Sequence, residues 1–294
     1  MLNSRLISQF IIILVSAIIS IVVGINVRSN NLDRRNSVQT PKITPPSSPP
    51  EEAKLPEKIA EEVELPQETK VEAVSEDTST TNTNTYKTTQ AFEEYKPKYF
   101  QANIDPSNYG DRYSADVNGN TLDNSPIVVL HETTNSLTSA INTFTTPHYH
   151  DSHQVSYHAL IALDGTIVYL VPSEKRAFGA GNSVFTSPQG SETVKTNPNL
   201  PSSVNNFAYH ISLETPPDGH DQQSQHSGYT DSQYKSLAWL LALSSIPDDR
   251  ITTHQNVDRS GNRFDPRSFD FDKFFQILHT YRQPTTVEAG TSSN

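Results

Sequence analysis

Apolar residues along the second half of the chain form short runs and alternating patterns that predict β-strands. The run at 127–130 is short, apolar and β-branched, which predicts a buried strand. Residues 155–163 and 166–171 predict a hairpin, because the Asp164-Gly165 pair between them is typical of a type I′ turn. Two further strands are predicted at 206–214 and 251–253.

Other stretches repeat apolar residues every three to four positions, which predicts helices. The strongest of these lies at 231–245, with Thr230 or Asp231 as its N-cap and Pro247 beyond its end. Shorter helices are predicted at 136–144 and 270–279. Because strands and helices are mixed along the chain, we expect an α/β fold in the broad, mixed α+β sense. It should hold a central, mostly mixed β-sheet flanked by helices.

The N-terminal part of the chain follows neither pattern. Residues 6–27 carry no charge, and a helix of that length crosses a hydrocarbon core of about 30 Å. We expect an uncleaved transmembrane signal anchor at 1–28, with a cleaved signal peptide as the alternative. Residues 29–95 are rich in Pro, Glu and Thr and predict a disordered linker. The folded domain is expected at 96–284, followed by a disordered tail at 285–294.

Composition narrows the classes of function. The formal net charge is −11 and no basic patch dominates, which argues against a nucleic-acid-binding protein. The chain has no cysteine, which excludes disulfides, thiolate metal sites and cysteine nucleophiles. Hydrophobic residues make up 34% of the 294 residues, a low share that fits a chain folded only in part.

Two histidines and an aspartate stand where a metal site can form. His131 and His254 each follow a predicted strand, and Asp265 lies in a rigid turn before a proline. Each residue alone has a plain structural explanation. Together they offer two imidazoles and a carboxylate, a ligand set that suits catalytic zinc and leaves a fourth position for water. The histidines lie 123 positions apart (254 − 131), which excludes a zinc finger and fits a site assembled by tertiary folding.

Several stretches resemble the zinc-dependent N-acetylmuramoyl-L-alanine amidase family, whose fold is shared with phage amidase lysozymes and peptidoglycan-recognition proteins. The matching stretches are 127–133, 155–161 with 164–167, 176–181 and 254–266. The resemblance implies one zinc ion on His131, His254 and Asp265. It also implies hydrolysis of the amide bond between N-acetylmuramic acid and L-alanine, with residues 96–284 as the catalytic domain.

The resemblance also implies roles for residues around the zinc. Tyr157 matches a tyrosine beside the metal, and Arg263 falls where the family usually has lysine, so it is expected to stabilise the oxyanion. Glu214 is expected as the general base, two residues beyond the usual glutamate position, which Ser212 occupies. The alternative for Glu214 is a structural carboxylate at a strand end. Gly179 replaces a histidine of the family motif, so a substrate contact is expected to be absent.

These expectations set the partners and the compartment. Peptidoglycan or muropeptides are the expected substrates, the membrane is reached through the N-terminal helix, and no nucleic acid is involved. Arginines after the span mildly oppose export, but the substrate places the domain outside the cytoplasm. We therefore expect an envelope protein in the periplasm or at the cell surface, secreted if the N-terminal segment is cleaved. Alternatives are a non-catalytic peptidoglycan-binding or sensing module, and an amidase that acts on released muropeptides.

Overall fold

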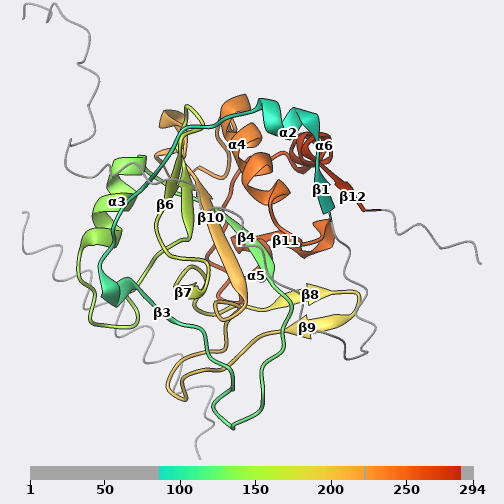
Figure 1. Ribbon diagram of the computed structural model, residues 1–294. Coiled ribbons are helices and arrows are strands. Elements are labelled where there is room, and N and C mark those ends of the chain that lie inside the picture. The colour runs from blue at the N-terminus through green and yellow to red at the C-terminus, as the bar shows by residue number, and fades with distance from the viewer. Residues whose placement is uncertain (1–85, 222, 286–294) are drawn as a thin grey trace, which may run out of the picture. The chain divides into compact units, whose positions relative to one another are not determined.

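A six-stranded mixed sheet forms the centre of the fold. The computed structural model describes residues 86–221 and 223–285. Its sheet has the order β11-β4-β10-β5-β6-β2 (Figure 1). The strands are β2 (Tyr99–Gln101), β4 (Ile127–Glu132), β5 (Ala159–Ile161), β6 (Ile167–Tyr169), β10 (Ala208–Leu213) and β11 (Ile251–Thr253). Only β5 and β6 pair antiparallel, while the other neighbours are parallel. The expected mixed α+β fold with a central mixed sheet is confirmed.

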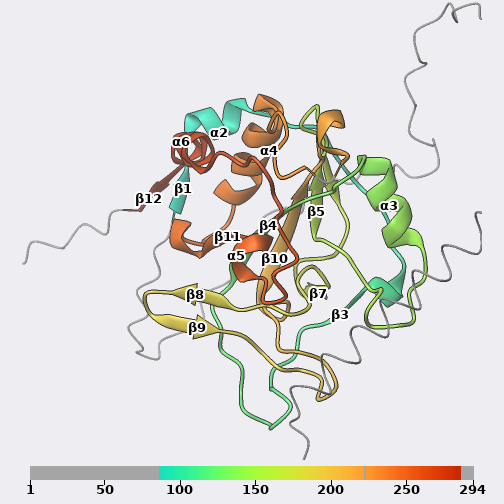
Figure 2. The same cartoon turned by 180° about the vertical axis from the view of Figure 1, so that it is seen from behind.

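Helices cover both faces of this sheet. The helices α2 (Gln90–Glu94), α4 (Asp231–Ala242) and α6 (Phe271–Tyr281) pack on one face, through a core that includes Leu130, Ile161 and Leu237. The helix α3 (Leu137–Thr145) packs on the other face against Leu160 and Val168. Figure 2 shows α3 and the α2–α4–α6 group on opposite sides of the strands. The predicted amphipathic helices therefore bury their apolar faces against the predicted strands.

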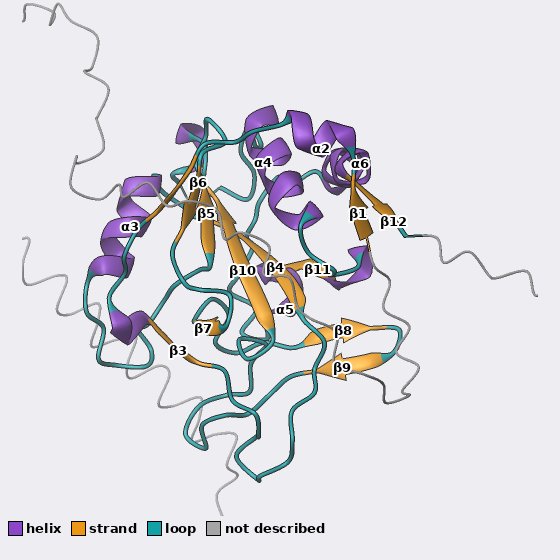
Figure 3. Cartoon of the chain, in the orientation of Figure 1, coloured by secondary structure: helices purple, strands orange, loops and turns teal. Residues whose placement is uncertain are grey.

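Smaller elements and long loops extend the second face of the sheet. They are β3 (Tyr109–Asp111) with β7 (Lys175–Ala177), β8 (Phe185–Ser187) with β9 (Gly190–Glu192), the short helix α5 (His254–Val257), and 3₁₀ turns at Pro106–Asn108, Pro217–Gly219 and Asp248–Arg250. Figure 3 shows that loops predominate around β3 and β7. A second apolar cluster, which contains Ile127, Val129 and Phe207, anchors this region to the sheet.

Side-chain caps define where the helices begin. Thr230 caps α4 and forms a capping box with Gln233, as one of the two predicted caps. At the other end α4 stops at Ala242, three residues before the predicted 245. Both the backbone N–H and the hydroxyl of Ser244 donate to the Leu241 carbonyl, which closes the helix in a turn. Pro247 therefore follows the helix end and does not set it.

The predicted hairpin forms, but its turn differs from the expectation. The pair Ala162–Thr166 flanks the loop, with the Ala162 N–H donating to the Thr166 carbonyl at 2.9 Å. Gly165 has φ +87°, whereas Asp164 is not among the residues with positive φ. A type I′ turn requires positive φ at both central residues. The type I′ assignment is therefore wrong, and the connection is a longer loop in which only Gly165 adopts the left-handed conformation.

The described residues begin at Tyr86, ten positions before the expected domain boundary at 96 (96 − 86). The strand β1 (Tyr86–Thr88) pairs antiparallel with β12 (Arg282–Pro284). Phe92, on α2, stacks on Trp239 with ring centroids 5.4 Å apart. These contacts pack a segment assigned to the linker against the core, because a buried aromatic ring removes a large apolar surface from water.

The expected anchor at 6–27 and most of the expected linker and tail lie outside the described residues. Within 86–221 and 223–285, no helix has both the length and the apolar character that a membrane span needs.

Candidate metal centre

Two neighbouring strands and one loop bring the predicted ligands together. His131 is the fifth residue of β4, and His254 directly follows β11, which pairs parallel with β4 through Thr253 and Leu130. Because parallel strands end at the same edge of a sheet, the two imidazoles meet there. Asp265 arrives from the loop after α5, where its carbonyl accepts from the Gln255 N–H at 3.0 Å.

The three side chains have the spacing of a metal site. The Asp265 Oδ2 atom lies 3.2 Å from His131 Nδ1 and 3.1 Å from His254 Nδ1. One candidate ligand atom from each residue lies within 4.8 Å of the others. Ligands about 2.0 Å from a tetrahedral zinc ion are separated by about 3.3 Å, close to these nitrogen–oxygen distances. The residues therefore fit a metal ion of this kind.

The electrostatics of the cluster favour the metal-binding protonation states. Burial lowers the pKa of His131 to about 4, against the opposing hydrogen bond with Asp265, so the imidazole is neutral. Burial raises the pKa of Asp265, but the hydrogen bonds with His131 and His254 outweigh this and hold it below its usual value. A neutral imidazole and an ionised carboxylate are the forms that bind metal.

The cluster opens into a cleft of about 920 Å³, which His254, Asp265, Tyr157 and Arg263 help to line. The Tyr157 ring stacks on His131, with centroids 4.4 Å apart. Burial raises the pKa of its phenol, which keeps the hydroxyl protonated and able to donate. The Arg263 side chain is exposed at the cleft. Tyr157 and Arg263 therefore border the same cleft as His254 and Asp265.

Glu214 has a different environment from the one expected. Its Oε1 atom accepts from the Leu137 N–H at 2.7 Å, and its Oε2 atom accepts from the Leu163 N–H at 3.0 Å. Leu137 is the first residue of α3, so this carboxylate stabilises the helix N-terminus and the hairpin loop. Glu214 is also not among the described residues that line the cleft. The geometry therefore favours the structural alternative over the expected general base.

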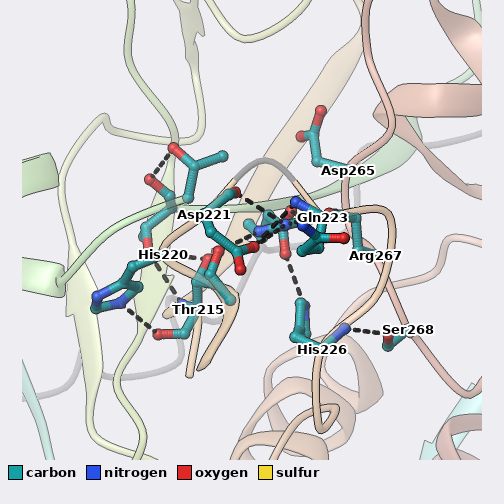
Figure 4. Close-up of polar contacts among 12 residues, drawn as sticks. Thr215, His220, Asp221, Gln223, His226, Asp265, Arg267 and Ser268 are labelled. Atoms are coloured by element: carbon teal, nitrogen blue, oxygen red, sulfur yellow. Dashed lines mark hydrogen bonds and ion pairs between the residues drawn. The ribbon is translucent and has the colours of Figure 1, made fainter. Parts of the chain in front are cut away.

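A buried ion-pair cluster links the two segments that carry ligands. The Arg267 Nε atom donates to Glu132, which directly follows His131, while Arg267 lies two residues after Asp265. The second Glu132 oxygen accepts from the Tyr229 hydroxyl at 2.9 Å and contacts His226 Nε2 at 3.0 Å. In Figure 4, Arg267 reaches toward Asp221 and Gln223, whereas Asp265 points away from them.

The Arg267 guanidinium also donates to the Gln223 and Gly219 carbonyls. The Glu132–Arg267 ion pair therefore fixes the end of β4 and the turn at Asp265 relative to each other. The sequence alone assigned no role to either residue, because they are separated by 135 positions.

A third histidine lies beside the ligands and was not expected there. His210, on β10, is fully buried, and its Nδ1 atom lies 2.9 Å from His131 Nε2. In the sequence, only the alternation of the predicted strand pointed to His210, because it places His210 and Ser212 on one face of β10. The register of β10 with β4 shows that His131 lies on this same face. Without the strand register, that signal could not be connected to His131.

Comparisons with known proteins find a similar family and similar relatives for the segment that holds these residues. Residues 123–268 match the family model described as N-acetylmuramoyl-L-alanine amidase. Over 129 residues the chain is 34% identical to the 1,6-anhydro-N-acetylmuramyl-L-alanine amidase AmpD of Salmonella typhimurium (strain LT2), covering 42% of this chain and 58% of that relative. It is 33% identical to the same enzyme of Citrobacter freundii, with the same coverage. The chain thus spans less than two thirds of these curated relatives.

Solved structures show weaker overall similarity. A crystal structure of an AmpD derivative is 26% identical with a TM-score of 0.41, over 62% of this chain and 94% of that chain. The endolysin amidase LysCS of Clostridium intestinale is 19% identical with a TM-score of 0.37, over 63% and 97%. The family model and the curated relatives confirm the resemblance seen in the sequence: residues 123–268 match the N-acetylmuramoyl-L-alanine amidase family.

Proposed function

We propose that this chain is a zinc-dependent amidase that hydrolyses the bond between N-acetylmuramic acid and L-alanine in peptidoglycan. The observation that carries the proposal is the convergence of His131, His254 and Asp265 in a cleft, within a segment that matches this amidase family. One zinc ion would be held by the two Nδ1 atoms and the Asp265 carboxylate. When bound, the ion lowers the pKa of water and polarises the scissile carbonyl.

The surrounding residues prepare the substrate for water attack. Asp265 holds both imidazoles in the orientation their Nδ1 atoms need, because its oxygens contact both rings. Tyr157 packs against His131 and keeps a phenolic proton that can be donated to the substrate carbonyl. Arg263 contributes a permanent positive charge at the cleft, which stabilises the negative charge that develops on the carbonyl oxygen. Because arginine stays protonated, this role is electrostatic and excludes proton transfer.

The substrate class follows from the relatives. The curated relatives are named 1,6-anhydro-N-acetylmuramyl-L-alanine amidases, and a solved relative from Pseudomonas aeruginosa, AmpDh3, is described in complex with an anhydromuramic pentapeptide. We therefore propose peptidoglycan or its soluble muropeptides as substrates. The test is to incubate the zinc-loaded chain with purified muramyl peptides and to separate the products by mass. Release of intact stem peptides supports the proposal, whereas unchanged substrate with zinc bound contradicts it.

A non-catalytic binding module is the second candidate. The observation in its favour is that Ser212 occupies the usual glutamate position while Glu214 is engaged by two backbone amides. Such a module would retain muropeptide binding without product release. Co-sedimentation with peptidoglycan, measured beside product formation, separates the two candidates, because only the enzyme yields new amino termini.

The cellular location remains a proposal drawn from the sequence. The uncharged stretch 6–27 supports a membrane anchor, and the expected substrate supports a catalytic domain outside the cytoplasm. Membrane fractionation of the full chain tests this against a variant without residues 1–28. Recovery of the full chain in the soluble fraction contradicts the anchor.

A further inference from the structure

One buried histidine beside the metal ligands has no assigned role. His210 lies on β10, two residues before Ser212, which is paired with His131 of β4. Side chains two positions apart share a face of a strand, so the His210 and His131 rings project to the same side of the sheet. The ring centroids are 5.1 Å apart, and His210 Nδ1 lies 2.9 Å from His131 Nε2. Both side chains are fully buried.

The direction of this hydrogen bond follows from the other side of the His131 ring. The His131 Nδ1 atom faces Asp265, so it is the candidate ligand atom and needs a free lone pair when a metal is bound. A neutral imidazole then carries its single proton on Nε2, and that atom must donate. The His210 Nδ1 atom is the acceptor within reach. His210 thereby selects the tautomer of His131 that can bind a metal.

The backbone of His210 is fixed by His158, which directly precedes the neighbouring strand β5. The His210 backbone N–H donates to His158 Nδ1 at 3.0 Å, and the His158 N–H donates to the His210 carbonyl at 2.8 Å. With its Nδ1 atom accepting, His210 carries its proton on Nε2. That atom is buried and has no hydrogen-bond partner among the described residues. An apolar side chain would fill this space without an orphaned donor, so filling the core does not explain a histidine here.

Gly179 provides the space that the His210 ring occupies. A Cβ atom at position 179 would lie 2.4 Å from His210 Nδ1 and 2.5 Å from Cγ. The backbone at Gly179 does not adopt a positive φ, so its conformation alone does not require glycine. The need is steric: any side chain at 179 would displace the imidazole that bonds His131.

We propose that His210 is a positioning residue of the metal centre, which accepts the Nε2 proton of His131 and depends on the space left by Gly179. This inference rests on the proposed zinc site but concerns metal binding and makes no claim about turnover. Its role is indirect, since His131 stands between His210 and the metal position.

Zinc affinity of the full chain, measured by competition with a chromophoric chelator, tests the proposal. His210→Leu removes the acceptor and keeps an apolar filling, and we expect the zinc affinity to fall about 10- to 100-fold. His210→Asn is the conservative variant, because the asparagine amide oxygen lies near the position of the His210 Nδ1 atom and can accept the same hydrogen bond. This variant should retain most of the zinc affinity of the parent chain. Nitrogen-15 shifts of the His131 ring in the metal-free chain should report a larger share of the Nε2-protonated tautomer in the parent than in His210→Leu, where the Nδ1-protonated form that donates to Asp265 gains.

A second pair of variants keeps the test valid if His210→Leu folds poorly. Gly179→Ala should weaken zinc binding in the parent chain and have little effect beside His210→Ala, because the clash then disappears. Parent-like zinc affinity in both His210→Leu and Gly179→Ala overturns the proposal. Equal losses in His210→Leu and His210→Asn also overturn it, since the acceptor would then be irrelevant. Zinc binding that follows this pattern without hydrolysis would refute the proposed function alone.

Discussion

Replacing Glu214 separates a structural role from a catalytic one. The carboxylate accepts two backbone hydrogen bonds, at 2.7 Å from Leu137 and at 3.0 Å from Leu163. A hydrogen bond to a charged group contributes about 1.5–3 kcal/mol. Glu214 is only partly buried, so water can replace part of the stabilisation that each hydrogen bond provides. We therefore take the lower end of this energy range for each of the two bonds. Glu214→Ala should therefore lower the free energy of unfolding by about 3 kcal/mol.

Glu214→Gln provides the graded comparison. The amide keeps one acceptor oxygen but turns an NH₂ group toward the second backbone N–H, so about one bond is lost, or about 1.5–2 kcal/mol. Loss of the negative charge at the N-terminus of α3 adds a few tenths of a kcal/mol. Urea unfolding at constant zinc concentration measures both variants, and turnover is then expressed per folded, zinc-loaded molecule.

We expect that normalised turnover to stay within about threefold of the parent in Glu214→Gln. A general base contributes about 10²–10⁴-fold. Turnover that falls 100-fold while the unfolding free energy is unchanged would refute the structural assignment and return Glu214 to the role of base.

Two further substitutions test the packing around the site. Glu132→Gln should destabilise the fold by about 3–5 kcal/mol, because it leaves the buried Arg267 charge with only the exposed Asp221 carboxylate, 3.9 Å away, as a counter-charge. The control is the exposed Glu93→Gln, which breaks a surface pair with Lys96 and should cost less than about 1 kcal/mol. Equal urea midpoints for these two variants would contradict the buried ion pair. Phe92→Ala should cost about 3 kcal/mol and alter the fluorescence of Trp239, the one tryptophan of the chain. An unchanged unfolding curve would show that the segment at 86–95 does not belong to the folded unit.

Sequence patterns were sufficient for the parts of the molecule that local physics determines. Apolar runs located β4 and β11, and the parallel pairing of such strands explains why His131 and His254 could be expected at one edge. The N-cap of α4 was predicted at Thr230 or Asp231 and lies at Thr230, because caps depend on hydrogen bonds within one helical turn.

Features that depend on contacts between distant segments could not be predicted from local sequence patterns. The partners of Glu214 lie on α3 and in the hairpin loop, so its backbone contacts emerge only when these elements pack. The same holds for His210, which reaches His131 only through the strand register and only because Gly179 leaves space. The turn at Gly165 was misassigned because the residue pair alone does not fix the length of the loop.

The most direct measurement is the appearance of new L-alanine amino termini when the zinc-loaded full chain is incubated with purified peptidoglycan and, in parallel, with soluble muropeptides. Asp265→Ala is the matched variant, because it removes the residue that contacts both candidate ligand histidines. We predict release by the parent chain that a chelator abolishes and added zinc restores, and no release by folded Asp265→Ala with reduced zinc content. Undiminished release in the presence of the chelator, or by folded Asp265→Ala, would contradict a zinc amidase built on His131, His254 and Asp265.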